Sequence, residues 1–194
     1  DWMEQGRRST YERLLQRGGT VAFAPHHLPV LVTSSDESDS PFNCSNKGVG
    51  FLPKPEYLQH YIALFQSVLA ETAGRPWQES LEKRIAAVSE FYFDRAAIEA
   101  RCLTTLEIFE QHTYRNLGRL PVAALHYTGN SPDYLSFQVD CVVEIIGPDD
   151  PRHEFIRLAR VMFEFDGFHI AQSDFPHAYL LWITGVKDKT PFRV

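Results

Sequence analysis

The sequence predicts an α+β fold: an antiparallel β-barrel or strongly curved sheet, with a helical insertion at about residues 55–112 and one crossing helix at about residues 150–164. Three observations predict this class. Apolar residues recur at helical spacing in the middle of the chain, alternate at period two after Leu120, and return to helical spacing after Asp150. Strands followed by helices and then by further strands favour α+β over a parallel doubly wound sheet or a pure helical bundle.

The N-terminal part predicts a short helix and a hairpin. Within Ser9–Arg17, apolar residues recur at helical spacing before two glycines end the pattern. β-forming residues at Val30–Thr33 precede the polar tract SSDESDS, and a second extended stretch ends at Phe51-Leu52. We expect these two stretches to form a hairpin with the polar tract as its solvated turn.

The middle of the chain predicts three helical segments. The first begins at Pro55 and ends near Gly74, the second follows Pro76, and the third follows Asp94. Their apolar stripes are Leu58, Tyr61, Ile62, Phe65, Val68 and Leu69 in the first, Trp77, Leu81, Ile85 and Val88 in the second, and Ile98, Cys102, Leu106 and Phe109 in the third. We therefore expect residues 55–112 to be a mostly helical insertion within one domain that spans residues 1–194.

The second half predicts strands around one helix. The runs VAALHYTG and YLSFQVDCVVEII are rich in β-branched and aromatic residues, and a turn-forming tract at 129–133 separates them, so we expect them to pair antiparallel. Asp150 is a suitable N-cap and Pro151 a suitable first residue for the crossing helix. The segments GFHIAQ and HAYLLWITGV predict two final strands.

Composition excludes several classes of function. Nineteen basic residues against twenty-five acidic ones give a net charge of −6, which is the wrong sign for a protein that binds nucleic acid through its phosphates. No apolar run approaches the roughly 18 residues of a membrane span. Three cysteines in a chain of this length do not indicate a disulfide framework, so we expect a cytoplasmic protein.

The histidines do not define a metal site. Glu107 and Glu110 share a face of a helix, but the E-x-x-H pairing of di-iron bundles is absent. His169 and His177 come close only if the last two strands pair, and the favoured interpretation is two half-exposed strand histidines. We predict no metal, while a metal- or haem-binding enzyme that uses some of the eight histidines remains an alternative.

The cysteines offer one candidate nucleophile. Cys44 lies near Lys47, whose positive charge favours a thiolate, but no histidine stands at a motif-like distance, and a small apolar filler is the favoured interpretation. Cys102 and Cys141 fall on predicted core faces, where we expect them to be inert. The G-x-G at residues 48–50 lacks the third glycine of a dinucleotide-binding fingerprint.

Two separated stretches carry a family resemblance. In PVLVTSSDESDSPFNCSNKGVGFL, an apolar strand and an acidic turn precede a second strand that runs through the S-x-K-G segment Ser45 to Gly48. In TYRNLGRLPVAALHYTGNSPDYLSFQVDCVVEIIGPDDPRHEF, a basic R-N-L turn precedes a strand, a turn, a longer strand and a helix that opens with D-P. Together they resemble the flavin-binding split barrels related to pyridoxamine phosphate oxidase.

The resemblance implies a six-stranded antiparallel barrel that binds FMN. It implies that the side chains of Lys47 and Arg115 come together to bind the phosphate of FMN, because charge-assisted hydrogen bonds to a dianion are strong and directional. Ser45 and Tyr114 would add hydroxyl contacts, and Asn116 would fix the turn or reach the ring system. The chain departs from the family where roughly sixty mostly helical residues follow the second strand, which leaves the third strand missing or displaced.

The resulting functional hypothesis is an FMN-binding oxidoreductase or flavin-dependent protein that acts on a small molecule. The flavin would perform the redox step, so no side chain need be a general base. The resemblance also implies a homodimer. The alternative is a non-catalytic accessory or ligand-binding subunit whose helical insertion docks on a partner protein in a larger complex.

Overall fold

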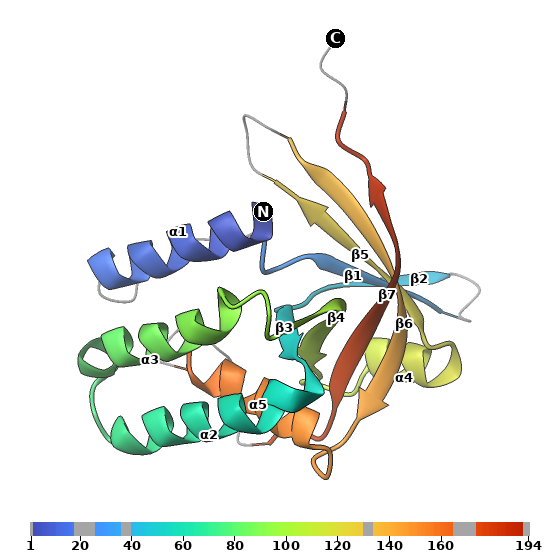
Figure 1. Ribbon diagram of the computed structural model, residues 1–194. Coiled ribbons are helices and arrows are strands. Elements are labelled where there is room, and N and C mark those ends of the chain that lie inside the picture. The colour runs from blue at the N-terminus through green and yellow to red at the C-terminus, as the bar shows by residue number, and fades with distance from the viewer. Residues whose placement is uncertain (1, 18–25, 36–39, 130–133, 165–173, 192–194) are drawn as a thin grey trace.

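The computed structural model describes residues 2–17, 26–35, 40–129, 134–164 and 174–191 (Figure 1). Its helices are α1 (Trp2–Arg17), α2 (Pro55–Glu71), α3 (Trp77–Tyr92), α4 (His112–Arg119) and α5 (Pro151–Val161). Its strands are β1 (Val30–Ser34), β2 (Phe42–Asn46), β3 (Gly50–Pro53), β4 (Ile98–Leu106), β5 (Val122–Thr128), β6 (Ser136–Ile146) and β7 (Ala178–Asp188). None of these helices is long and apolar enough to cross a membrane.

The seven strands form one antiparallel sheet in the order β2-β1-β5-β6-β7-β4-β3. This architecture confirms the α+β prediction and its strongly curved sheet. The outer strands β2 and β3 do not pair with each other within the described residues, so the sheet is not closed into a barrel.

The link between β2 and β3 shows why the sheet must curl. These strands lie at opposite edges of the sheet, yet only residues 47–49 join them. Seven flat strands about 4.8 Å apart would separate the edges by roughly 29 Å, whereas a link of this length reaches at most about 14 Å. The backbone N–H of Val49 donates to the carbonyl of His27 at 2.9 Å and fixes the crossing.

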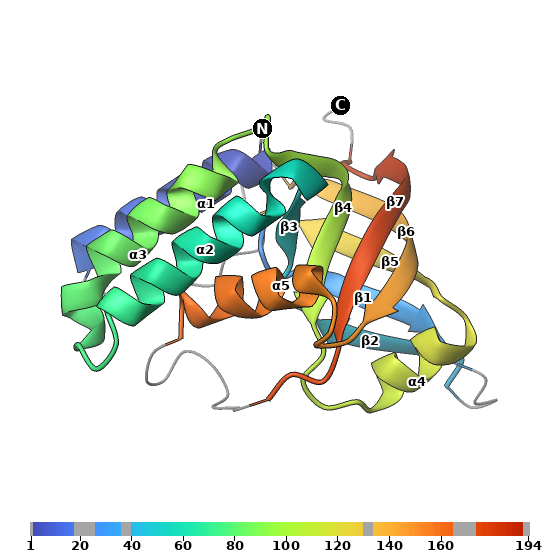
Figure 2. The same cartoon turned by 60° about the horizontal axis from the view of Figure 1, so that its bottom comes forward.

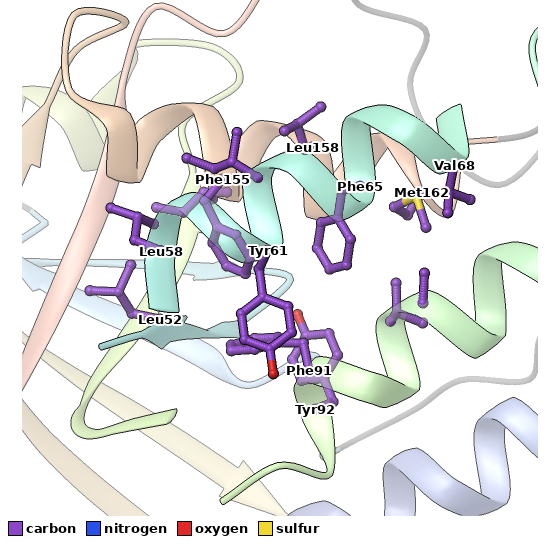
Figure 3. Packing of buried hydrophobic residues seen from close by; sticks show 14 of the residues in the cluster. Leu52, Leu58, Tyr61, Phe65, Val68, Phe91, Tyr92, Phe155, Leu158 and Met162 are labelled. Carbon is purple, nitrogen blue, oxygen red and sulfur yellow. The ribbon is translucent and has the colours of Figure 1, made fainter. Parts of the chain in front are cut away.

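Two apolar clusters lie on the two faces of the sheet. On the outer face, α2 packs against β3, α5 packs against β3 and β4, and α3 packs against α2 (Figure 2). Phe155 there stacks on Phe65 with ring centroids 5.5 Å apart and meets Phe91 edge-on at 5.0 Å (Figure 3). The inner face holds a second cluster that includes Leu125 and Tyr179. Trp2 of α1 packs against this cluster, and Leu117 of α4 belongs to it.

The helical insertion is only partly as predicted. Helices α2 and α3 occur where Pro55 and Pro76 predict their starts, but the third predicted helical segment is strand β4, which pairs with β3 and β7. Ile98, Cys102 and Leu106 are spaced by four residues, and this spacing also keeps side chains on one face of a strand. Strand β3 thus follows β2 directly, and β4 is the strand that lies beyond the two helices.

Of two local predictions near the candidate residues, one is confirmed in part and the other is wrong. The predicted hairpin forms between β1 and β2, but its second strand ends at Asn46, and Phe51 lies in the separate strand β3. The predicted R-N-L turn lies inside helix α4, whose Leu117 is buried in the inner cluster. Burial of this apolar residue stabilises a helix where the sequence pattern indicated a turn.

The second half follows the prediction closely. Strands β5 and β6 pair antiparallel, and α5 begins at Pro151 with the Asp150 carboxylate accepting from the Arg152 backbone N–H at 2.8 Å. Strand β7 coincides with the last predicted strand. The predicted strand GFHIAQ, with His169, lies outside the described residues.

Candidate functional site

Helix α4 is attached to the strands β1 and β2 by polar side chains. Thr113 Oγ1 accepts a hydrogen bond from Asn43 Nδ2 at 3.0 Å and lies 3.3 Å from Ser45 Oγ. Asn116 Nδ2 donates to Thr33 Oγ1 at 3.1 Å, and both of these side chains are buried. These contacts bring together the two stretches that carry the family resemblance.

A buried carboxylate lies beside this contact. Glu107 is 2% exposed, and its Oε2 accepts from Lys47 Nζ at 3.0 Å and from the Tyr179 hydroxyl at 2.6 Å. Its Oε1 accepts from three backbone N–H groups, those of residues 108, 109 and 110, at 2.9 to 3.1 Å. Five donors thus converge on one side chain and fix the start of the loop before α4.

The electrostatics agree with this geometry. Burial acts to raise the pKa of Glu107, but the hydrogen bond from Tyr179 and the charge of Lys47 outweigh it and hold the pKa below its usual value. Burial, together with the Glu107 carboxylate, raises the pKa of Tyr179. The cluster is therefore an ion pair of Lys47 with the Glu107 carboxylate beside a neutral phenol.

The two basic residues expected at a phosphate have different surroundings. The Lys47 side chain is only 11% exposed, and its charge is compensated by Glu107. Arg115 is exposed on α4, with its Nη2 3.4 Å from Nδ1 of His112. The guanidinium of Arg115 is therefore accessible to an anion, whereas Lys47 would have to exchange a carboxylate for a phosphate.

Tyr114 takes part in a separate chain of contacts. Its hydroxyl lies 3.3 Å from Nε2 of His177, and Nδ1 of His177 lies 2.6 Å from Oε1 of Glu110. Sequence reasoning considered Glu107 and Glu110 only as possible metal ligands on one helical face, and it missed Thr113. The signal that could have found Thr113 is its position directly before the Y-R-N residues of the resemblance.

The cysteines differ in their environments. Cys44 is exposed on β2, while Cys102 and Cys141 are buried. Burial raises the pKa of both buried thiols to about 12, which keeps them protonated at neutral pH. Among the described residues, no three His, Cys, Asp or Glu side chains form a group that could hold a metal ion.

A shallow hollow of about 500 Å³ lies where β6 meets α5. Asp149 and Asp150 contribute to its lining, and Asp150 also caps α5. Two carboxylates make this hollow unfavourable for a phosphate group.

No protein-family model and no curated protein sequence matches the chain. Several solved structures are similar to it, among them the following three. HupZ from Group A Streptococcus is 8% identical over 84% of this chain and 86% of that chain, with a TM-score of 0.46. An F420 reductase is 15% identical over 91% of this chain and 95% of that chain, with a TM-score of 0.45. A putative pyridoxamine 5'-phosphate oxidase from Listeria innocua is 9% identical over 96% of this chain and 97% of that chain, with a TM-score of 0.45. Likeness at this level concerns the course of the backbone and not bound molecules.

Proposed function

We propose that the protein binds a flavin-type cofactor, FMN, beside α4 and acts as an oxidoreductase on a small-molecule substrate. The observation that carries the proposal is the attachment of α4 to β1 and β2 through Thr113 and Asn116. It places the exposed guanidinium of Arg115 on a helix that is fixed to the sheet.

A phosphate dianion suits this location. Arg115 offers several donors in a planar fork, which matches the geometry of phosphate oxygens. Ser45 and Asn116 lie at the two contacts that hold the helix, and Tyr114 is its half-buried aromatic residue. Because Glu107 already compensates Lys47, phosphate binding depends chiefly on Arg115.

The flavin would supply the hydride or electron transfer when bound. The chain's own residues would hold the phosphate and orient the ring system against the sheet. Buried contacts such as Asn116 with Thr33 restrict the motion of α4, and this restriction favours a single orientation of the cofactor.

We also propose that the protein works as a homodimer. The outer face of the sheet carries exposed apolar side chains at Phe42, Val122 and Val142, which are 65%, 41% and 45% exposed. Val122 and Val142 are direct partners across β5 and β6. A second copy would remove this surface from water. Sedimentation should show a dimer in the wild type and a monomer in Val142→Asp.

Titration of FMN with the purified chain, followed by flavin fluorescence, tests the cofactor. Arg115→Ala should weaken FMN binding at least about tenfold, because a charge-assisted hydrogen bond contributes about 1.5–3 kcal/mol. Arg101→Ala is the matched control, since Arg101 is an exposed arginine in the middle of strand β4 and not on α4. Equal losses in the two variants would remove Arg115 from the site. A wild-type chain that does not bind FMN would favour the accessory-subunit alternative.

A further inference from the structure

Three side chains from separate segments form a continuous row of contacts beside α4. Glu110 lies in the loop before the helix, Tyr114 in its first turns, and His177 directly before β7. The imidazole Nδ1 lies 2.6 Å from the Glu110 carboxylate, and Nε2 lies 3.3 Å from the Tyr114 hydroxyl. The His177 and Glu110 side chains are 27% and 41% exposed, so a small molecule can reach them.

The backbone holds Glu110 in an unfavourable conformation. Its φ of 47° lies in the left-handed region, which costs a residue with a side chain about 1–2 kcal/mol. The backbone N–H of Glu110 donates to the buried Glu107 carboxylate at 3.1 Å, which compensates this strain. Strain of this kind accumulates where a functional geometry has to be maintained. Here it directs the Glu110 carboxylate at His177.

The partners determine where the protons lie. A carboxylate only accepts, so the tautomer of His177 that fits both contacts is the one with its proton on Nδ1, toward Glu110. Nε2 is then the acceptor, and the Tyr114 hydroxyl donates to it. A phenol oxygen that donates its proton keeps lone pairs that can accept from an outside donor.

We propose that Tyr114, His177 and Glu110 form a proton-transfer site for a small aromatic weak acid of the phenol class. The O–H bond of the ligand breaks, and its proton forms a new O–H bond on Tyr114. The proton that Tyr114 releases forms an N–H bond at Nε2 of His177. The electron pair stays on the ligand oxygen, and the phenolate faces an imidazolium that Glu110 stabilises.

The neighbouring loop residue favours an aromatic ligand. Phe109 directly precedes Glu110 and is 58% exposed, although large aromatic side chains are usually buried. Its backbone N–H donates to Glu107 at 2.9 Å, so the residue is fixed beside the row of contacts. The proposed ligand therefore carries an aromatic ring for the exposed Phe109 side chain and a hydroxyl for Tyr114.

The probe for this site is 4-nitrophenol, whose phenolate has its own visible absorption, and it is added to the chain without flavin. At a pH where the free probe is half ionised, the bound probe should be roughly nine-tenths phenolate, a shift of about one unit. This result does not require that the flavin proposal holds, and a failure here would leave FMN binding untouched.

Variants separate proton transfer from simple binding. Glu110→Gln should bind the probe but lose most of the shift, and Tyr114→Phe should abolish it. Phe109→Ala should weaken binding while the bound probe keeps its shift.

His60→Phe is the control, because His60 pairs with Glu90 at 3.4 Å on an exposed helix face elsewhere. Unchanged thermal unfolding midpoints would show that the variants fold. An unshifted probe in the wild type, a full shift in Tyr114→Phe, or an equal loss in His60→Phe would overturn the proposal.

Discussion

The helix-covered outer face of the sheet and the margins of its inner face bury different kinds of side chain. Under α2, α3 and α5 most buried side chains are apolar, with stacked rings such as Phe65 and Phe155, and the buried polar side chains Thr72, Ser80 and His153 are isolated among them. Where α4 and α1 meet the inner face, buried polar groups recur. Glu107 accepts five hydrogen bonds beside α4, and Arg7 of α1 donates to the Val49 carbonyl at 2.8 Å.

This difference indicates that the apolar outer layer stabilises the fold, whereas the polar margins of the inner face hold functional side chains in fixed positions. Apolar burial is non-directional, so it holds the helices without demanding one arrangement of donors. Polar groups shielded from water require their partners at fixed distances. A region of this second kind can maintain a strained residue such as Glu110, and it is where both proposed sites lie.

The largest expected effect is in the apolar layer. Phe155 is fully buried between Phe65 and Phe91. Phe155→Ala should lower the free energy of unfolding by about 3–5 kcal/mol in a denaturant titration, because it leaves a cavity. Leu15→Ala, at a side chain that is 47% exposed, should cost less than about 1 kcal/mol. Comparable losses would mean that the outer cluster is not the principal core.

The next effect tests the buried carboxylate beside α4. Glu107→Gln should lower the free energy of unfolding by about 3 kcal/mol, because it leaves the Lys47 charge buried without its partner. Adding Lys47→Met should restore part of this loss, since the two residues are coupled. Glu82→Gln, an exposed control on α3, should change stability by less than about 0.5 kcal/mol. A Glu107→Gln variant as stable as the control would contradict the positioning role.

A smaller effect tests His26, a buried polar residue that contacts α1. Burial, with the charges of Arg7 and Arg13, lowers the pKa of His26 from 6.5 to about 4. The folded protein therefore favours the neutral ring, and its stability is complete above pH 6.5 and falls as the pH drops toward 4. At about pH 5 the loss should be roughly 2 kcal/mol.

The measurement is the free energy of unfolding at neutral pH and at about pH 5. His26→Phe should remove this part of the pH dependence, and the exposed-site variant His60→Phe should retain it. Identical acid sensitivity in the wild type and His26→Phe would show that His26 is not the group responsible.

The smallest effect isolates the strain at Glu110. At a φ of 47°, glycine has no Cβ to clash, so Glu110→Gly should be about 1 kcal/mol more stable than Glu110→Ala. Both lose the carboxylate, so their difference in unfolding free energy reports only the backbone. A more stable alanine variant would mean that Glu110 does not hold the left-handed conformation in solution.

The sequence predicts elements that carry their own local signals. Helices α2 and α5 begin at prolines, and β5 and β6 show the alternation of half-buried strands. Strand β4 was missed because apolar residues four apart satisfy both the helical period and the strand period. Local pattern alone cannot decide between them when long-range pairing with β3 and β7 stabilises the strand.

The candidate site is harder to predict from the sequence than these helices and strands. The resemblance selected Ser45 and Asn116, which take part in the two separate polar contacts that fix α4, Ser45 with Thr113 and Asn116 with Thr33. The ion pair of Lys47 with Glu107 joins residues sixty positions apart. Its formation depends on the curl of the sheet and on the register of β4, and neither is encoded in local spacing.

Comparison of FMN with riboflavin tests the central claim most directly, because the two ligands differ only in the phosphate. Calorimetric titration should show FMN binding at least about tenfold tighter than riboflavin to the wild type. Arg115→Ala should abolish most of that difference. Equal affinities of the wild type for both ligands, or a preference for FMN that survives Arg115→Ala, would contradict a phosphate site on α4.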